Sequence, residues 1–353
     1  MPKAVSLFSG AGGLDLGFEN AGFSIVYACE KDRDSAATWK ANRPQLKEVM
    51  HVGDIATQMA DIAKLKDIDI VFGGPPCQGF SVAGKMNRDD PRNKLVGVFM
   101  EVVHLIKPKV FVLENVKSLA TSTKWEDVRK SIGVVAKRLG YDLAFDVYKA
   151  SDYGVPENRE RLLLIGVKAD LGQASRFQEE LVRLREKPIG LREALLGVGE
   201  FGTESNPNTC NARITVAKRP VLRRSAYSGM LVNGAGRPVN LDENSQTLTA
   251  SMGGNSTPII DQRALGDSSK TNWFELLHDN MSADSSHASA VKVPTYIRRL
   301  TLKEAAAIQT FPKDYRFLGH RCSQYRQIGN AVPCRLAELA AMAVSRAYMN
   351  GVE

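Results

Sequence analysis

The sequence predicts an α/β fold with a mostly parallel sheet, helices on both of its faces, and a smaller irregular domain inserted into it. In the first half of the chain, short apolar runs alternate with segments of helical length, a pattern typical of parallel sheets. Residues 200–290 are instead rich in Gly, Ser, Asn, Thr and Pro, which indicates loops and short β-strands. Helical periodicity returns from Leu302 onward.

The predicted strands are short apolar runs, and they are Ala4–Phe8, Ser24–Cys29, Ile68–Gly73, Val110–Glu114, Leu143–Lys149 and Leu162–Val167. The predicted helices include Ser35–Lys40, Glu126–Leu139, Leu302–Gln309 and Arg335–Met349. The predicted domains are 1–185, an inserted domain 186–296, and 297–353, which returns to the first. Ligands of such sheets bind beyond the carboxyl ends of the strands, so the residues that follow each strand are the candidates for a site.

Composition favours a soluble protein with an anionic partner. Of 353 residues, 43% are hydrophobic and 24% are charged, and the net charge of +8 suits a nucleic acid. The longest apolar runs are too short to cross a bilayer, and no secretory signal is recognised, so we expect a cytoplasmic protein with no membrane partner. The five cysteines include no CxxC pair and the five histidines are scattered, so no metal site is predicted.

A glycine-rich turn follows the first predicted strand. Glycines in the sequence Phe8-Ser-Gly-Ala-Gly-Gly13 let the backbone approach a ligand closely, and Glu30 closes the second strand, where a carboxylate can accept hydrogen bonds from ribose hydroxyls. Together they indicate a site for an adenosine-type cofactor. A nicotinamide dinucleotide, or a tight turn without a ligand, remains an alternative for this segment alone.

A cysteine in a restrained loop follows the third predicted strand. Two prolines in Gly74-Pro-Pro-Cys77-Gln-Gly-Phe-Ser81 fix the backbone just ahead of Cys77 and hold its thiol at the sheet edge. A thiol with a pKa of about 8.5 is a few per cent thiolate at neutral pH, which makes Cys77 a candidate nucleophile. The other cysteines are expected to be inert, buried small hydrophobes, and they are Cys29, Cys210, Cys322 and Cys334.

Three further polar segments flank predicted strands or helices. Glu114-Asn-Val closes the fourth strand at the same edge as Cys77, or it caps the following helix. Val155-Pro-Glu-Asn-Arg-Glu-Arg161 could orient Glu114 or bind phosphate, or it is a solvated charged turn. Gln327-Ile-Gly-Asn-Ala-Val-Pro333 opens the last helix and could return a polar side chain to the cofactor site, or it is a helix cap.

In this order, these segments resemble the motifs of the DNA (cytosine-5)-methyltransferase family of bacterial restriction-modification systems. The similarity covers nearly the whole chain outside its variable middle and includes Gly53-Asp-Ile55 and Arg298–Pro312. It implies a Rossmann-like S-adenosylmethionine-dependent fold and methyl transfer to C5 of cytosine in double-stranded DNA. S-adenosylmethionine is the implied cofactor and S-adenosylhomocysteine its product. The base would flip out of the duplex and form a covalent adduct between Cys77 and C6.

The resemblance also assigns roles to individual residues. The implied catalytic residues are Cys77, Glu114, Arg159 and Arg161. The implied cofactor residues are Phe8, Gly10, Gly12, Glu30, Asp54, Ile55, Pro76 and Asn330. Glu157 departs from the family pattern, which often has Gln, and Ala83 stands where some members have a serine that fills the space left by the flipped base.

The middle domain resembles a target-recognition domain, since Ser205–Leu241 holds six Lys or Arg residues and no Asp or Glu. The candidate DNA-binding residues are basic, hydroxyl-bearing or glycine, and they are Ser81, Lys85, Arg88, Arg92, Arg213, Arg223, Arg224, Arg237, Thr247, Gly253 and Gly254. Tyr227–Pro238 is similar to segments that recognise CCGG-centred sites. The family pattern further implies a monomer, with or without a separate cognate restriction endonuclease.

Three other functions compete with this hypothesis. An RNA (tRNA) cytosine-5 methyltransferase is the main alternative, and the long Gly- and Asn-rich middle segment argues against it. A nicotinamide-dependent oxidoreductase would leave Cys77 and Glu114 without roles. A non-catalytic DNA-binding protein would not need a nucleophile.

Overall fold

The computed structural model describes residues 1–76, 94–283 and 291–349, and its contacts divide the chain into two compact units. The first unit comprises Met1–Gly154, Glu160–Lys187 and Ala331–Glu353, and the second comprises Val155–Arg159 and Pro188–Asn330. The first unit thus resumes at Ala331, whereas the sequence suggested 297. The difference arises because β13 (Ile297–Arg299) pairs with β12 (Ile259–Asp261), which keeps the segment after 297 with the second unit.

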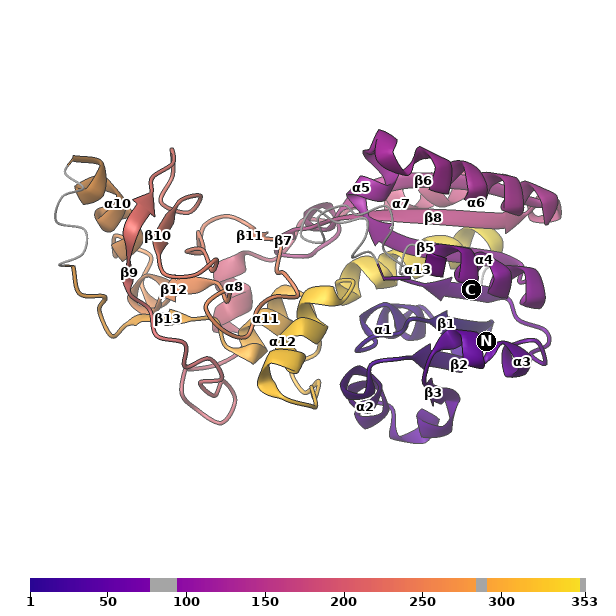
Figure 1. The fold of residues 1–353 in the computed structure, drawn as a ribbon, viewed down its shortest axis with the longest axis horizontal. Coiled ribbons are helices and arrows are strands. Elements are labelled where there is room, and N and C mark those ends of the chain that lie inside the picture. The colour runs from indigo at the N-terminus through magenta and orange to yellow at the C-terminus, as the bar shows by residue number, and fades with distance from the viewer. Residues whose placement is uncertain (77–93, 284–290, 350–353) are drawn as a thin grey trace. The chain divides into compact units, whose positions relative to one another are not determined.

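Among the described residues, the first unit contains a seven-stranded sheet in the order β3-β2-β1-β4-β5-β8-β6 (Figure 1). The strands are β1 (Lys3–Leu7), β2 (Ser24–Glu30), β3 (Met50–Val52), β4 (Ile70–Gly73), β5 (Val110–Val116), β6 (Tyr141–Lys149) and β8 (Glu160–Lys168). Neighbours from β3 through β5 are parallel, and β8 runs antiparallel to both β5 and β6. The predicted fold class is confirmed. The strand order reverses between β1 and β4, which is where such sheets form a crevice for ligands.

Helices cover both faces of this sheet (Figure 1). Alternate strand residues point to opposite faces, so Val71 and Phe72 of β4 belong to different cores. Val71 packs in a cluster with side chains of α3 (Met59–Ile62), α4 (Leu95–Ile106), α5 (Lys117–Thr121) and α6 (Glu126–Arg138). Phe72 stacks on Phe18 of α1 (Gly13–Asn20) with the ring centroids 4.0 Å apart. α1 packs on α13 (Cys334–Tyr348), which in turn packs on α7 (Ser175–Arg183), and α2 (Arg33–Ala41) precedes β3.

The helix α1 packs unusually close to α13 because it carries a glycine at the contact. A Cβ atom built on Gly17 would lie 2.4 Å from the Cβ of Ala337 and 2.4 Å from the backbone nitrogen of Glu338. No real side chain tolerates such distances to backbone, so Gly17 sets the separation of the two helices. This contact fixes the helix that follows the glycine-rich turn.

A buried polar network also holds the start of α1. Asp15, fully buried, accepts a hydrogen bond of 2.7 Å from Nε1 of Trp39 on α2. Arg43, also buried, forms an ion pair of 2.7 Å with Glu19 and donates to the carbonyl of Gly12 at 3.2 Å. Burial raises the pKa of Asp15 to about 6, although the positive charge of Arg43 opposes the shift. The network therefore fixes the end of the glycine-rich loop. It also buries the carboxylate of Asp15, and burial disfavours the charged form of that group.

Among the described residues, the second unit has short strands in three two-stranded pairings, β9 with β10, β7 with β11 and β12 with β13, beside several helices (Figure 1). Its elements are β7 (Glu157–Asn158), α8 (Leu191–Leu196), β9 (Val216–Val221), β10 (Met230–Val232), β11 (Ser245–Gln246), β12, α9 (Gln262–Gly266), α10 (Trp273–Ala283), β13, α11 (Leu302–Ile308) and α12 (Arg321–Asn330). The first unit also contains short 3-10 turns, and they are Pro44–Val49, Ile55–Thr57, Thr123–Trp125, Ala150–Asp152 and Ala169–Leu171. In the part of the chain that the structure describes, no helix is long and apolar enough to span a bilayer.

We predict that Gly17→Ala destabilises the protein by about 1–3 kcal/mol, because the added methyl group overpacks the α1–α13 contact. The matched control is Gly133→Ala within α6, where a Cβ atom would meet nothing within 4 Å. That substitution should stabilise the protein by about 0.5–1 kcal/mol through helix propensity. Urea unfolding of both variants is the measurement, and equal effects would contradict the packing argument.

We further predict that charging Asp15 lowers stability as the pH rises. Its pKa is about 6 in the folded chain and 3.8 when unperturbed, so the stabilising effect of the protonated form is full below pH 3.8 and is lost as the pH rises through 6. Asp15→Asn keeps an acceptor for Trp39 and removes the charge. The variant should gain on the order of 2–3 kcal/mol relative to the parent between pH 4 and pH 7.5, measured by urea unfolding.

The control for this experiment is Asp61→Asn, because Asp61 forms an exposed surface pair with Lys64. Its removal should not increase stability at pH 7.5. If Asp15→Asn and the parent protein have parallel pH profiles, Asp15 does not titrate in the folded state as argued.

Candidate active site

The glycine-rich loop leaves β1 in a conformation that requires glycine. Gly10 has φ of 55° and Gly12 has φ of 87°, both in the left-handed region that side chains disfavour. A Cβ atom on Gly10 would meet no atom of the described residues within 4 Å, so these residues leave the space beside Gly10 open. Phe8 also adopts φ of 55°, a strained value for an aromatic residue, and such strain is found at ligand sites.

Glu30 lies at the end of β2, and its carboxylate is bound by the glycine-rich loop. One oxygen accepts from the amide of Gly10 at 2.8 Å, and the other accepts from the amide of Asp32 at 2.7 Å. Burial raises the pKa of Glu30 above its usual range, and these two amides oppose the shift. Each carboxylate oxygen can accept a second hydrogen bond, so Glu30 is positioned and still has capacity for hydroxyl donors.

The predicted residues after β3 have two different environments. Ile55 is buried and packs in the core beneath the sheet edge. Asp54 is partly exposed and accepts from Lys31 at 2.8 Å and from the amide of Ala56 at 3.1 Å, so it begins a short 3-10 turn. The hydrogen bond from Lys31 lowers the pKa of Asp54. Asp54 is therefore ionised at the sheet edge, and Ile55 supplies the apolar support beside it.

The loop after β4 leads to Cys77, which lies outside the described residues. Its last described part is held by β5, because Nδ2 of the buried Asn115 donates to the carbonyl of Pro75 at 3.1 Å. A Cβ atom on Gly74 would lie 2.6 Å from Oε2 of Glu114, so a larger residue there would have to displace the Glu114 carboxylate. Gly74 and Pro75 thus contact the Glu114-Asn115 pair just ahead of the candidate nucleophile.

Glu114 and Arg161 form an ion pair at this edge of the sheet. Nε of Arg161 lies 2.8 Å from Oε1 of Glu114, and both side chains are 12% exposed. The pair follows from the sheet register, since antiparallel pairing of β5 with β8 places Val116 opposite Arg161 and Glu114 opposite Leu163. The structure therefore brings Glu114 and Arg161 together, with Gly74 beside them, at the carboxyl ends of β4 and β5.

Arg159 has a different environment from Arg161 although it is only two residues away. It belongs to the second unit and is almost fully buried there. Its guanidinium donates to the carbonyls of Leu248 at 2.9 Å and Gly329 at 2.7 Å, and it lies 3.6 Å from Oε1 of Glu157. These three contacts are with the backbone of the second unit and with Glu157.

Asn330, which was predicted to bind the cofactor, ends α12 and is exposed. The segment Gln327–Pro333 does not open the last helix as the sequence suggested. Instead, Gln327–Asn330 forms the last turn of α12, and α13 begins afterward at Cys334. The two helices are separate because Pro333, at the N-cap of α13, has an extended ψ of 130°.

The candidate DNA-binding residues fall into three groups. Ser81, Lys85, Arg88 and Arg92 lie outside the described residues. Five others are exposed in the second unit, and they are Arg213, Arg223, Arg224, Arg237 and Thr247. Gly253 is buried, because a Cβ atom there would lie 2.9 Å from the Cα atom of Cys322, and Gly254 is partly exposed. The position of Gly253 is thus explained by packing.

The described cysteines differ from the expectation at one position. Cys29, Cys210 and Cys334 are buried as predicted, whereas Cys322 is exposed on α12. Cys322 follows Arg321, the first residue of α12, and its thiol lies 3.5 Å from the carbonyl of Gly253. Among the described residues, no group of three His, Cys, Asp or Glu side chains could hold a metal ion.

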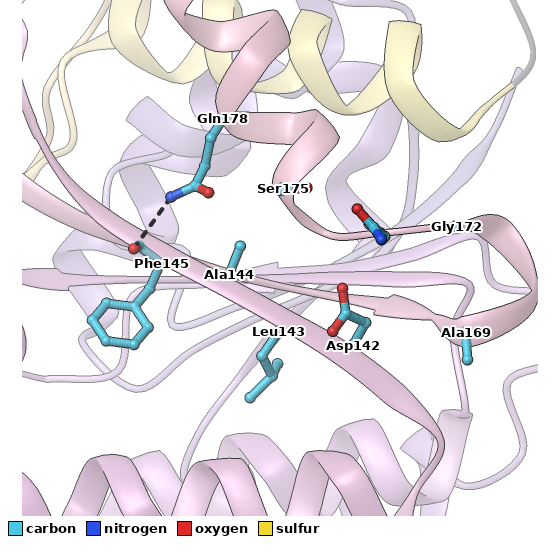
Figure 2. Close-up of a pocket in the computed structure, with 9 residues that line it drawn as sticks. Asp142, Leu143, Ala144, Phe145, Ala169, Gly172, Ser175 and Gln178 are labelled. Carbon is cyan, nitrogen blue, oxygen red and sulfur yellow. Dashed lines mark hydrogen bonds between the residues drawn. The ribbon is translucent and has the colours of Figure 1, made fainter.

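A shallow depression of about 610 Å³ lies elsewhere on the first unit, between β6 and the start of α7 (Figure 2). Its lining includes Asp142, Phe145 and Gln178, and Nε2 of Gln178 donates to the carbonyl of Phe145 at 3.3 Å. None of the predicted site residues lines it. The site is therefore defined by the strand ends and not by this depression.

Sequence reasoning missed two sets of residues that shape the site. Asn115, which holds the loop before Cys77, was quoted only as the neighbour of Glu114, and its burial beside that loop was not predicted. The Asp15, Trp39 and Arg43 network was also missed, because it joins residues that have no shared motif. The one available signal was an acidic residue in the first turn of the helix after the glycines, which is usually a simple helix-terminus preference.

The C-5 cytosine-specific DNA methylase family model matches residues 2–346. The chain is 35% identical over 363 residues to the Type II methyltransferase M.XorII of Xanthomonas oryzae pv. oryzae, covering 95% of this chain and 82% of that one. It is 34% identical over 356 residues to the Type II methyltransferase M1.HphI of Haemophilus parahaemolyticus, covering 98% of this chain and 87% of that one.

Solved structures agree with the fold. The S. pombe Dnmt2 methyltransferase has a TM-score of 0.65 at 17% identity, covering 99% of both chains. The Entamoeba histolytica methyltransferase EhMeth has a TM-score of 0.64 at 17% identity, covering 98% of both chains. These similarities support the α/β fold, and the family match confirms the resemblance predicted from the motifs. The chain belongs to the C-5 cytosine-specific DNA methylase family.

Proposed function

We propose that this protein transfers a methyl group from S-adenosylmethionine to C5 of cytosine in double-stranded DNA, through a covalent adduct of Cys77. The observation that carries the proposal is the Glu114–Arg161 ion pair of 2.8 Å, which lies against Gly74 at the carboxyl edge of the sheet. Family membership supplies the reaction class. Cys77 follows Gly74 by three residues in the sequence, so the proposed nucleophile and the proposed base-binding groups would belong to one site.

The first unit suits an adenosine-containing cofactor. The space beside Gly10 lies at the end of β1, and the Glu30 carboxylate, which the amide of Gly10 holds, lies at the end of β2. Both are near the point between β1 and β4 where the strand order reverses. The residues that would hold the cofactor are Phe8, Gly10, Gly12, Glu30, Asp54, Ile55, Pro76 and Asn330. When bound, S-adenosylmethionine supplies an electrophilic methyl group on a sulfonium. Glu30 would accept from the ribose hydroxyls, and the glycines would let the backbone approach.

The residues at the strand ends would activate the base. C5 of cytosine is a poor nucleophile until the thiolate of Cys77 adds to C6, which makes C5 enamine-like. Glu114 would bind the exocyclic amine and N3, and Arg161 would hold Glu114 and stabilise the charge that develops on the ring. After methylation, loss of the C5 proton and elimination of the thiol restore aromaticity and free Cys77.

Arg159 would act as a positioning residue in this scheme. Its guanidinium is buried and donates to the carbonyls of Leu248 and Gly329, so it would support the backbone of the second unit. The direct contact with the base is assigned to Arg161. The second unit, with its exposed arginines, would bind and recognise the DNA.

The cellular role that we propose is restriction-modification, supported by the similarity to Type II methyltransferases. The protein would act as a monomer in the bacterial cytoplasm, and a cognate endonuclease would act separately on the same sequence. Recognition of a CCGG-centred site stays a hypothesis.

The deciding experiment measures transfer of labelled methyl from S-adenosylmethionine to duplex DNA and, in parallel, to tRNA. Site-specific 5-methylcytosine in duplex DNA, located by bisulfite sequencing, would support the proposal and would reveal whether the site is CCGG-centred. Transfer to tRNA alone would favour the RNA methyltransferase alternative. Duplex binding without any transfer would favour a non-catalytic binding protein.

We predict that Cys77→Ser abolishes methyl transfer and leaves DNA binding intact, because serine's hydroxyl is far less ionised than a thiol at neutral pH. The rate should fall by at least about 10³-fold, since the replaced group makes the covalent bond. Single-turnover transfer and gel-shift binding are the measurements. A variant that retains transfer would show that another residue is the nucleophile.

Glu114→Gln should lower kcat by about 10²–10³-fold with a small change in DNA affinity, because Glu114 acts on the base during adduct formation. Glu160→Gln is the matched control: Glu160 forms an exposed pair with Lys117 at 2.8 Å on the same strand as Arg161. Its loss should cost less than about 1 kcal/mol in stability and leave kcat unchanged. Equal kcat values for the two variants would remove Glu114 from the mechanism.

A further inference from the structure

A carboxylate that the proposed mechanism does not use lies buried close to the glycine-rich loop. Asp15, in the first turn of α1, is fully buried, and its Oδ1 accepts a hydrogen bond of 2.7 Å from Nε1 of Trp39. Among the described residues, no donor meets the geometry of a hydrogen bond to its second oxygen, Oδ2. Burial with so few donors disfavours the charged form of a carboxylate. Asp15 is therefore a group that can exchange a proton when its surroundings change.

Two sets of polar contacts connect Asp15 to the glycine-rich loop. The buried hydroxyl of Ser6 favours the ionised form of Asp15, and it lies 2.8 Å from the hydroxyl of Ser9 in the loop. Arg43 attracts the Asp15 carboxylate and donates to the carbonyl of Gly12 at 3.2 Å. A change of charge on Asp15 thus acts on groups that contact the loop at both of its ends.

The charge of this buried network depends on the proton of Asp15. The other ionisable groups around it are two ion pairs and two thiols, and they are Arg43 with Glu19, Arg335 with Glu338, Cys29 of β2 and Cys334 of α13. In each pair the arginine balances the carboxylate. Burial raises the pKa of both thiols, that of Cys29 to about 12, so both are neutral. Ionisation of Asp15 therefore adds one negative charge beside the loop.

We propose that ionised Asp15 favours a cation in the glycine-rich loop, so that the protein binds S-adenosylmethionine in preference to S-adenosylhomocysteine and releases the proton of Asp15 to solvent on binding. This inference rests on the proposed function. The two molecules differ by the methyl group and the positive charge of the sulfonium, and a charge in the poorly solvated interior acts more strongly than one in water. A ligand that binds better to the ionised form must, by linkage, favour loss of the proton. Asp15 is then a specificity-determining residue that acts through its charge.

The direction of the pH dependence follows from the burial of Asp15. Burial raises its pKa to about 6, and Arg43 and Trp39 oppose the shift. Above pH 6, Asp15 is already ionised when the cofactor arrives, so S-adenosylmethionine binds with full affinity. As the pH falls through 6, binding must first remove the proton, and the affinity for S-adenosylmethionine decreases. S-adenosylhomocysteine has no sulfonium charge, so the preference for S-adenosylmethionine increases from pH 5 to pH 7.

The first measurement is an NMR titration of the full chain without DNA. The indole N–H of Trp39 reports the ionisation of Asp15, because it donates to that carboxylate, and Trp125 and Trp273 are internal references. The Trp39 signal should move with a midpoint near pH 6. Saturating S-adenosylmethionine should lower the midpoint by about 0.5–1 on the pH scale, and S-adenosylhomocysteine should leave it in place. A midpoint that neither ligand moves, or that both move equally, would overturn the inference.

Calorimetric titration then gives the Kd of each ligand at pH 5 and pH 7. The ratio of the Kd for S-adenosylhomocysteine to that for S-adenosylmethionine should rise about 2–5-fold between these pH values in the parent protein. It should stay constant in Asp15→Asn, whereas the matched control Asp61→Asn, which removes an exposed carboxylate, should behave as the parent does. Trp39→Phe removes a donor to Asp15 and should move the rise to higher pH. A rise that persists in Asp15→Asn would belong to another carboxylate, such as Glu30, and would contradict the inference.

Methyl transfer to duplex DNA separates this inference from the proposed function. If the protein binds S-adenosylmethionine with the expected loss of a proton but transfers no methyl group, the proposed function fails and the inference about Asp15 stands. If it methylates DNA while the Trp39 midpoint stays unchanged, the proposed function stands and the inference fails. Failure to bind S-adenosylmethionine at either pH would also overturn the inference.

Discussion

A buried carboxylate and a buried guanidinium need each other as partners, because burial removes the water that would stabilise their charges. In this protein Glu114 and Arg161 form such a pair. Each side chain is only 12% exposed, so neither could be ionised there at low cost without its partner. The antiparallel register of β5 and β8 makes the pair possible, since it sets Val116 opposite Arg161. Reversal of β8 within an otherwise parallel set of neighbours therefore has a chemical consequence, because it starts a strand where β4 and β5 end.

The other strand ends are arranged around the same edge by close packing. A Cβ atom on Gly73 would lie 2.2 Å from the carbonyl oxygen of Leu7, so β1 and β4 approach as closely as glycine permits. Beyond β1, the left-handed Gly12 leads into α1, and Arg43 binds its carbonyl. Beyond β4, Asn115 binds the carbonyl of Pro75. Gly12 and Pro75, which follow the two strands, are thus held by buried polar groups from other elements, which suits a site that must keep its shape without a ligand.

The sequence predicted the parts that follow from local pattern. Apolar runs located six strands of the main sheet, and the glycines, Cys77, Glu114 and Arg161 are candidate site residues because each follows or precedes such a run. The three-residue β3 was missed, since its residues are mostly exposed and too few to show a period. The pairing of β7 with β11 was also missed, because it joins segments almost ninety residues apart and two residues long. Neither Arg159 nor Arg161 carries a local signal for its surroundings, and only the tertiary contacts show that Arg159 bonds to Leu248 and Gly329 whereas Arg161 pairs with Glu114.

Arg159 and Arg161 lie two residues apart in the sequence but belong to different units. Val155–Arg159 belongs to the second unit by its contacts, although the chain on both sides of it belongs to the first. Glu157 accepts from the amide of Leu248 at 2.6 Å, and Arg159 donates to the carbonyl of the same residue. Two positions later, Arg161 is paired with Glu114 in the first unit.

The buried hydrogen bonds of Glu157 and Arg159 restrain the backbone of the second unit up to Arg159. Replacing the usual Gln by Glu at position 157 adds a charge that Arg159, 3.6 Å away, can neutralise. Within the second unit, Glu157 and Arg159 thus hold the segment Val155–Arg159 through Leu248, Gly329 and each other.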